Sequence, residues 1–355
     1  MTSNSLPLSP FSMLVLLREE EIARQLRQAF RERYLPEHLF YWLPSSVHAW
    51  VELCRSTEYK NANRSLELLR IAAPKLALRF SQSRALCGLG CGEGSKDRVL
   101  LEAFASTGNK LDYMAADFSQ ALLELAANSA EEVAAIVSGC KMDIFDDAHL
   151  SALIGEAHAN SFDGPVLFSI LGNTLGAFDP KAFPARMRTH LHHQDRLVFD
   201  GEIFSEHTLA GYDNPTNRRF AWGPLTGVGI TEADGRLEFS TAPSTDGLFA
   251  VTKHFLATRD LRVNLGGEAI EIRAGEKLRM SGSIKYASES AFLGMVEAGG
   301  FKIESSWKTA DGSFVLACAR PERFHHGDTE YTEKTKAIEH EGHEGHEGHE
   351  GHEEF

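Results

Sequence analysis

One glycine-rich stretch constrains the fold of this chain more than any other part of the sequence. Residues 84–89 are mostly apolar and are typical of a short buried strand, and a helical pattern begins near Ser95. Glycine recurs at every second position across this junction, at Gly88, Gly90, Gly92 and Gly94. A strand that turns through glycines into a helix brings backbone N–H groups close to a bound ligand, because no Cβ blocks the approach. The stretch therefore predicts a strand, a ligand-binding turn and a helix in that order.

The spacing of these glycines indicates which ligand the turn binds. A dinucleotide-binding turn follows the pattern Gly-x-Gly-x-x-Gly, and Gly90-x-Gly92-x-Gly94 is one residue too short for it. The shorter spacing favours a ligand whose sugar and amino-acid parts lie across the turn, and S-adenosylmethionine (SAM) is such a ligand. The alternative is a turn with a structural role only.

A second expected strand, residues 111–116, ends on Asp117. An acid at the end of the second strand, roughly twenty residues after the glycine turn, binds the ribose hydroxyls in folds of this kind. The alternative is that Asp117 caps the helix that follows, with Ser119 in its first turn. The glycine turn and the placed acid together predict a SAM site.

The spacing of apolar residues predicts alternating strands and helices from residue 84 to residue 200. Strands are expected at 84–89, 111–116, 139–142, 166–171 and 196–200, and helices at 95–106, 118–137, 147–158 and 180–192. Such alternation implies a parallel sheet with helices on both faces. Ligands bind at the carboxyl ends of the strands of such sheets. Four residues occupy those ends and predict one cleft: Gly90, Asp117, Asp143 and Asn173.

The flanking segments depart from this alternation. Helices are expected at 12–34 and 65–80, with an aromatic-rich stretch at 39–50 between them. Residues 201–287 contain turn signals and short alternating runs that indicate a hairpin-rich insertion, after which a helix and a hairpin complete the sheet. We therefore expect an α/β fold of the class I SAM-dependent methyltransferase type. Its Rossmann-like, mostly parallel sheet would have seven strands, and the flanking segments would form a second, mixed α+β domain.

Charge and cysteine content limit the partners and the compartment. The net charge of −14 argues against nucleic acid as a partner. Five cysteines form no C-x-x-C pair, which is typical of reduced thiols in a cytosolic protein. The apolar run at 11–17 is too short to span a membrane. We expect a cytoplasmic protein that binds a small molecule, and the sequence leaves its oligomeric state open.

Residues 321–355 differ in composition from the rest of the chain. His-Glu-Gly repeats there, with no apolar face to bury, so we expect disorder. Histidines of this kind bind transition metals, so metal binding by the tail is an alternative function. No metal site is predicted elsewhere.

Three motifs resemble one known family. They are Leu89-Gly90-Cys91-Gly92 with Lys96 and Arg98, then Ala116-Asp117-Phe118-Ser119, then Gly172-Asn173-Thr174-Leu175-Gly176. Together they resemble the histidine-specific, SAM-dependent methyltransferases of ergothioneine biosynthesis. The resemblance implies a SAM domain formed by residues 66–200 and 288–320, and a substrate domain formed by residues 11–65 and 201–287.

The motifs and the resemblance together predict the residues of the site. Contacts with SAM are expected from Gly88, Gly90, Gly92, Lys96, Asp117, Phe118, Asp143, Ile144 and Asn173. Contacts with the substrate are expected from Tyr59, Tyr212, Ser281 and Ser283. Tyr41 and Tyr212 are the candidate catalytic residues, because a tyrosine can orient an amine or hydrogen-bond its proton without acting as a strong base.

Two positions depart from the pattern of that family. Its second glycine motif ends in Gly-Asn, where this chain has Gly176-Ala177, and it places a glutamate where this chain has Ser281. A lost hydrogen bond to a charged group costs about 1.5–3 kcal/mol. We therefore expect methylation of a small amino acid or related amine other than histidine. The alternative enzyme class uses SAM without methyl transfer, by intramolecular cyclisation or aminocarboxypropyl transfer.

Overall fold

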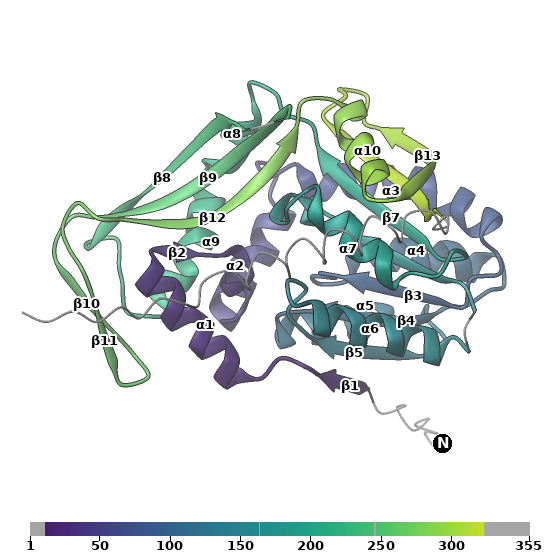
Figure 1. Ribbon diagram of the computed structural model, residues 1–355, viewed down its shortest axis with the longest axis horizontal. Helices are drawn as coiled ribbons and strands as arrows, with labels where there is room; N and C mark the ends of the chain where they lie inside the picture. The colour runs from purple at the N-terminus through teal and green to yellow at the C-terminus, as the bar shows by residue number, and fades with distance from the viewer. Residues whose placement is uncertain (1–10, 163, 245, 323–355) are drawn as a thin grey trace, which may run out of the picture. The chain divides into compact units, whose positions relative to one another are not determined.

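An eight-stranded sheet forms the centre of the fold. The computed structural model describes residues 11–162, 164–244 and 246–322, and the elements below belong to the unit that ends at Pro321. The strand order is β1-β5-β4-β3-β6-β7-β14-β13 (Figure 1). The bounds are β1 Ser12–Val15, β3 Ala85–Leu89, β4 Asp112–Asp117, β5 Val137–Lys141, β6 Val166–Ile170, β7 Arg196–Glu202, β13 Phe301–Lys308 and β14 Phe314–Pro321. All neighbours from β1 to β7 pair in parallel, while β14 is antiparallel to β7 and β13. The expected mostly parallel α/β sheet is thereby confirmed.

Helices cover both faces of this sheet. One face packs against α6 (Asp147–Asn160), α7 (Ala182–His190) and α10 (Glu289–Ala298). The other packs against α3 (Asn61–Arg79), α4 (Ser95–Ser106) and α5 (Gln120–Ala130).

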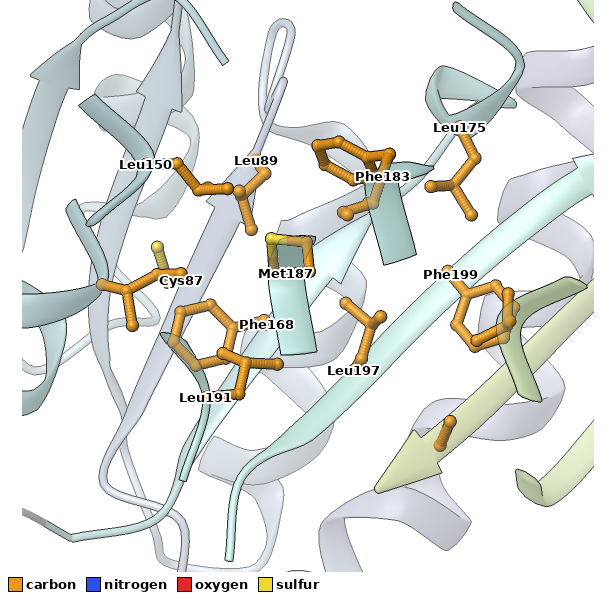
Figure 2. Packing of buried hydrophobic residues seen from close by; sticks show 14 of the residues in the cluster. Cys87, Leu89, Leu150, Phe168, Leu175, Phe183, Met187, Leu191, Leu197 and Phe199 are labelled. Carbon is orange, nitrogen blue, oxygen red and sulfur yellow. The ribbon is translucent and has the colours of Figure 1, made fainter. Parts of the chain in front are cut away.

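Alternate residues of each central strand face opposite cores. In β3, Cys87 and Leu89 join the α6–α7 side, where Figure 2 shows them beside Phe168 and Met187, whereas Leu86 joins the α3–α4 side. Burial on both faces explains why these strands are apolar almost throughout.

The N-terminal segment differs from its prediction as a single helix over residues 12–34. Residues 12–15 form β1, an eighth strand, and α1 begins only at Glu19 and ends at Glu32. The apolar residues at 14, 15 and 17 suit either structure, but β5 would otherwise be an edge strand with unpaired backbone groups, and β1 pairs with them. Three acids, Glu19 to Glu21, then complement the positive end of the dipole of α1.

A four-stranded sheet forms the second layer, in the order β2-β12-β9-β8. Its strands are β2 Tyr34–Leu35, β8 Gly235–Pro243, β9 Leu248–Ala257 and β12 Lys277–Tyr286, and a separate hairpin joins β10 Leu261–Leu265 to β11 Glu268–Ile272. It shares a third apolar core with α1, with the short helix η1 (Glu37–Tyr41), and with α2 (Pro44–Arg55) and α9 (Pro215–Thr226). Two short helices complete the fold: η2 (Thr174–Ala177) follows β6, and α8 (Thr208–Tyr212) follows β7.

Four further predictions concern one helix, the cysteines, membrane spans and the tail. The helix expected at 65–80 is α3, which begins four residues earlier and continues through Pro74. All five cysteines are buried and unpaired. Among the described residues, every helix is too short or too polar to cross a bilayer. The predicted disordered tail and its metal binding lie outside the described residues, apart from Pro321 and Glu322.

Gly94 allows the glycine turn to pack closely against α5. Its φ is +81°, and an added Cβ would lie 2.7 Å from the Cα atom of Ala126. We expect Gly94→Ala to lower the free energy of unfolding by about 2–5 kcal/mol, the sum of left-handed strain and overpacking. Gly108 is a matched control, with φ +85° and no atom within 4 Å of an added Cβ. Gly108→Ala should cost only about 1–2 kcal/mol. Equal losses for the two variants in urea denaturation would contradict the packing argument.

Candidate functional site

A cavity lies at the carboxyl ends of β3, β4, β5 and β6. It encloses about 1110 Å³ of free space, counted with its open mouth. The segment from Glu37 to Ala62 forms another part of its wall, together with Tyr212 and Ser283. Twelve residues predicted for the site line it: Tyr41, Tyr59, Gly90, Gly92, Lys96, Asp117, Phe118, Asp143, Ile144, Asn173, Tyr212 and Ser283. The four strand-end residues expected to share one cleft are therefore found together.

Two predicted site residues, Gly88 and Ser281, are not part of this lining. Gly88 lies inside β3, where an added Cβ would be 2.2 Å from a carboxylate oxygen of the buried Asp97. Ser281 occupies a bulge of β12 with φ +55°, and its buried hydroxyl has no hydrogen-bond partner among the described residues. Both are therefore placed beside the cavity rather than on its surface.

Asp117 connects the glycine turn to the second strand. One carboxylate oxygen accepts the N–H of Gly92 at 3.0 Å, and the other accepts the N–H of Ser119 at 2.9 Å. The N-cap of α5 is Ser119, whose hydroxyl accepts from Leu122 N, so Asp117 is not the capping residue. Burial raises the pKa of Asp117 to about 6. A buried acceptor beside a glycine turn suits a pair of ligand hydroxyls.

Two other charged residues occupy the same end of the cavity. Asp143 accepts the N–H of Phe145 at 2.9 Å and the side-chain amide of Gln25 at 3.2 Å. Lys96 is buried, and its ammonium lies 5.9 Å from the ring centroid of Trp50. Within the described part of the chain, Lys96 pairs with no carboxylate, so it can bind an anionic group of a ligand.

A buried polar network forms the wall around Tyr212. The hydroxyl of Tyr212 donates to Glu202 at 3.0 Å and accepts from the amide of Asn61 at 3.0 Å. Glu202 also pairs with Lys285 at 3.1 Å, and both are almost fully buried. The Lys285 ammonium lies 4.7 Å from the ring centroid of Tyr212.

This network determines which hydrogen bonds the wall can offer to a ligand. Ser283 accepts from Lys285 at 2.9 Å and from Asn173 at 3.1 Å, which uses both hydroxyl lone pairs and leaves its O–H to donate. Tyr212 uses its O–H in the hydrogen bond to Glu202 and one lone pair in the bond from Asn61, which leaves one lone pair free. The wall therefore presents a donor at Ser283 and an acceptor at Tyr212.

Three residues of this network were not predicted: Asn61, Glu202 and Lys285. Two weak sequence signals could have indicated the ion pair of Glu202 and Lys285. Glu202 lies two residues past the expected end of its strand, at the edge of the sheet where ligands bind. Lys285 follows Ser283 by two residues in one strand, so the two side chains lie on the same face.

Aromatic residues and one carboxylate complete this part of the cavity. Burial raises the pKa of Tyr41, Tyr59 and Tyr212 well above the usual value, so all three are neutral. Glu37 lines the cavity and accepts the hydroxyl of Tyr41 at 3.4 Å. No ammonium or guanidinium pairs with Glu37 among the residues that the structure describes. Glu37 was also missing from the predicted site.

One group of possible metal ligands occurs among the described residues, outside the cavity. His158, His192 and Asp195 have ligand atoms within 4.8 Å of one another. The carboxylate of Asp195 is already used, because it bonds the ring of His158 at 2.8 Å and accepts the N–H groups of Val166 and His192. These bonds tie α6 to the starts of β6 and β7, which is a structural role.

The fold and the cavity define a Rossmann-like enzyme that binds a small molecule at the carboxyl ends of its strands. The sequence model of the family described as "Histidine-specific methyltransferase, SAM-dependent" matches residues 18–219 and 247–321. The chain belongs to this family and is a SAM-dependent methyltransferase.

Curated relatives and solved structures extend the comparison. The chain is 22% identical over 305 residues to the N-methyltransferase imqF of Aspergillus flavus, covering 80% of each chain. It is 21% identical over 322 residues to the N-methyltransferase dtpB of the same species, covering 84% of this chain and 87% of the relative. Among solved structures, a SAM-dependent methyltransferase from Clostridium acetobutylicum is 13% identical with a TM-score of 0.38, covering 78% of this chain and 97% of its own.

SAM affinity should depend on pH through Asp117. The ionised carboxylate can accept two hydroxyls, and burial raises the pKa of Asp117 to about 6 in the free protein. Binding favours the ionised form, so affinity should be constant above pH 7 and fall by up to about tenfold per pH unit below 6.

Calorimetry between pH 5 and 8 would measure this dependence. Asp117→Asn should flatten the profile and weaken binding at pH 8 by about 1.5–3 kcal/mol, because one charged acceptor is lost. An unchanged profile in the variant would remove Asp117 from the cofactor site.

Proposed function

We propose that this enzyme transfers the methyl group of SAM to the nitrogen of a small amino acid or related amine, and that histidine is not its acceptor. Membership of the methyltransferase family supports the reaction class. The two curated relatives are N-methyltransferases, which supports nitrogen as the atom that is methylated. The observation that carries the proposal is a cavity wall that contains an acceptor, Tyr212, a donor, Ser283, and a carboxylate, Glu37, that pairs with no cation among the described residues.

In this proposal SAM occupies the end of the cavity formed by the large sheet. Asp117 would bind the ribose hydroxyls, and the glycine turn at Gly90 and Gly92 would lie along the ligand. Lys96 would pair with the carboxylate of the methionine part, because it is a buried cation that pairs with no carboxylate in the described ranges. Residues 66–200 and 288–320 would then form the SAM domain, and residues 11–65 and 201–287 the substrate domain.

The acceptor would lie against the network around Tyr212. The O–H of Ser283 suits a carboxylate, whereas the lone pair of Tyr212 and the carboxylate of Glu37 suit an ammonium or amine. A hydrogen-bond donor in one place and acceptors in the other match the carboxylate and the ammonium of an amino acid. Tyr41 and Tyr59 would pack around the acceptor and exclude water.

The chemical step needs geometry and the loss of one proton. An ammonium has no lone pair, so one N–H proton must leave before the nitrogen attacks. Glu37 is only half-buried and can accept that proton and release it to solvent. The nitrogen lone pair then bonds to the methyl carbon while the carbon–sulfur bond breaks, and its electron pair stays on sulfur to give S-adenosylhomocysteine. A reacting distance of about 3–3.5 Å and a collinear approach are the main requirements.

Two residues argue against histidine as the acceptor. Ala177 lines the cavity, and its methyl group forms no hydrogen bond where the family resemblance implies an asparagine. Ser281 lies outside the lining and offers no carboxylate to an imidazole. Since each missing contact to a charged group costs about 1.5–3 kcal/mol, the two together should lower kcat/KM for histidine by at least a hundredfold.

A screen of free amino acids and amines with methyl-labelled SAM tests the proposal. We expect labelled product from at least one amino acid or amine, equimolar S-adenosylhomocysteine, and turnover of histidine at least a hundredfold lower. Methylthioadenosine as the product would instead indicate a SAM-dependent reaction other than methyl transfer. Efficient trimethylation of histidine would contradict the assigned specificity.

Removing the charge of Glu37 should weaken acceptor binding selectively. We expect Glu37→Gln to raise KM for the amine about tenfold or more, because a charged hydrogen bond of about 1.5–3 kcal/mol is lost. It should also lower kcat, because glutamine cannot accept the proton of the ammonium. The Kd for SAM should change by less than about twofold.

Glu52→Gln is the control for this experiment. Glu52 lies on α2 and pairs with Arg219 at 2.9 Å, and it does not line the cavity. It should leave kcat, KM and the Kd for SAM unchanged. A KM that is the same in Glu37→Gln and wild type would remove Glu37 from the acceptor site.

A further inference from the structure

His38 has a buried polar atom without a partner in the cavity wall. It lies on η1, and its Nδ1 has no hydrogen-bond partner among the described residues. The ring lies 5.0 Å from the centroid of Phe118 and 5.2 Å from that of Phe145. Buried polar atoms in proteins nearly always have a partner, so an unpaired one that borders a ligand cavity points to a bond with the ligand.

The surroundings of His38 suit a flat heteroaromatic group. Phe118 directly follows Asp117 at the end of β4, and Phe145 follows Asp143 by two residues after β5. Phe145 in turn packs on Phe178 at 4.6 Å between centroids. Aromatic walls with a single polar atom are typical of sites that bind a planar ring and orient it by one hydrogen bond.

The imidazole can bond to the edge of a purine in either tautomer. Burial lowers the pKa of His38, although the carboxylates of Asp143 and Glu37 oppose the shift, so the ring is neutral. A neutral imidazole has one donor and one acceptor nitrogen. Adenine offers both an amino group and ring-nitrogen acceptors along its edge.

We propose that Nδ1 of His38 hydrogen-bonds the adenine of SAM, so that η1 forms part of the cofactor site. This inference rests on the proposed placement of SAM between the glycine turn and Asp117. It has a consequence for catalysis, because the same short helix carries Glu37 and Tyr41. Bound SAM then holds in place the helix that contacts the acceptor, and SAM should bind before the amine.

Calorimetry with two ligands tests whether His38 contacts the base. S-adenosylhomocysteine contains adenine, and S-ribosylhomocysteine lacks it but keeps the ribose and the amino acid. His38→Phe keeps an aromatic ring between Phe118 and Phe145 and removes the nitrogen. We expect this variant to weaken binding of S-adenosylhomocysteine by about three- to tenfold and binding of S-ribosylhomocysteine by less than twofold. His38→Asn, which keeps a polar atom near Nδ1, should recover part of the loss.

Other outcomes would overturn the inference. Unchanged affinity of His38→Phe for S-adenosylhomocysteine would contradict the proposed hydrogen bond. Equal loss of affinity for both ligands would mean that His38 contacts the ribose or stabilises the fold. Asp117→Ala tests the placement of the cofactor separately from the role of His38. It should weaken binding of both ligands, because both contain the ribose. If Asp117→Ala lowers ligand affinity and His38→Phe does not, only the role of His38 is overturned. If neither variant changes ligand affinity, the placement of SAM is overturned as well.

Discussion

The buried ion pair between Glu202 and Lys285 connects the two layers of this enzyme. Glu202 ends β7 of the eight-stranded sheet, and Lys285 lies in β12 of the four-stranded sheet. Glu202 has a second cation, Arg64, at 3.9 Å, whereas Lys285 pairs with no other carboxylate among the described residues. Loss of Glu202 would therefore leave the buried Lys285 uncompensated, at a cost of several kcal/mol. Asn61 of α3 and Tyr212 of α8 bond to the same carboxylate. Four elements that are distant in the sequence therefore meet at one charge pair beside the cavity.

The ion pair also polarises the cavity wall. Lys285 and Asn173 both donate to Ser283, and Glu202 accepts the hydrogen bond of the Tyr212 hydroxyl. The wall gains a fixed donor and a fixed acceptor from charges that do not line the cavity themselves. Gly176 makes this arrangement possible, because an added Cβ would lie 2.7 Å from the carbonyl oxygen of Ile284 in β12. Close contact between η2 and β12 is thus part of how this wall of the cavity is built.

The alternating strands and helices were predictable because their signals are local. Burial on both faces gives the central strands runs of apolar residues, and the positive φ of Gly90 and Gly92 requires glycine at the turn. The prediction for residues 12–15 was wrong because an edge strand depends on its partner β5, far along the chain. The bulge at Ser281 left no sequence signal either, since strand alternation alone places Ser281 and Ser283 on one face.

The sequence by itself determined the class of fold, the cofactor and most of the residues at the strand ends. Those features follow from periodicity, glycine spacing and the rule that parallel strands end at one edge. Only the tertiary structure showed that Asn61, Glu202 and Lys285 form one network, and that His38 and Glu37 line the same cavity as Asp117. The sequence does not show which residue will pair with a given charged side chain. That partner is decided by which elements pack together once the chain has folded.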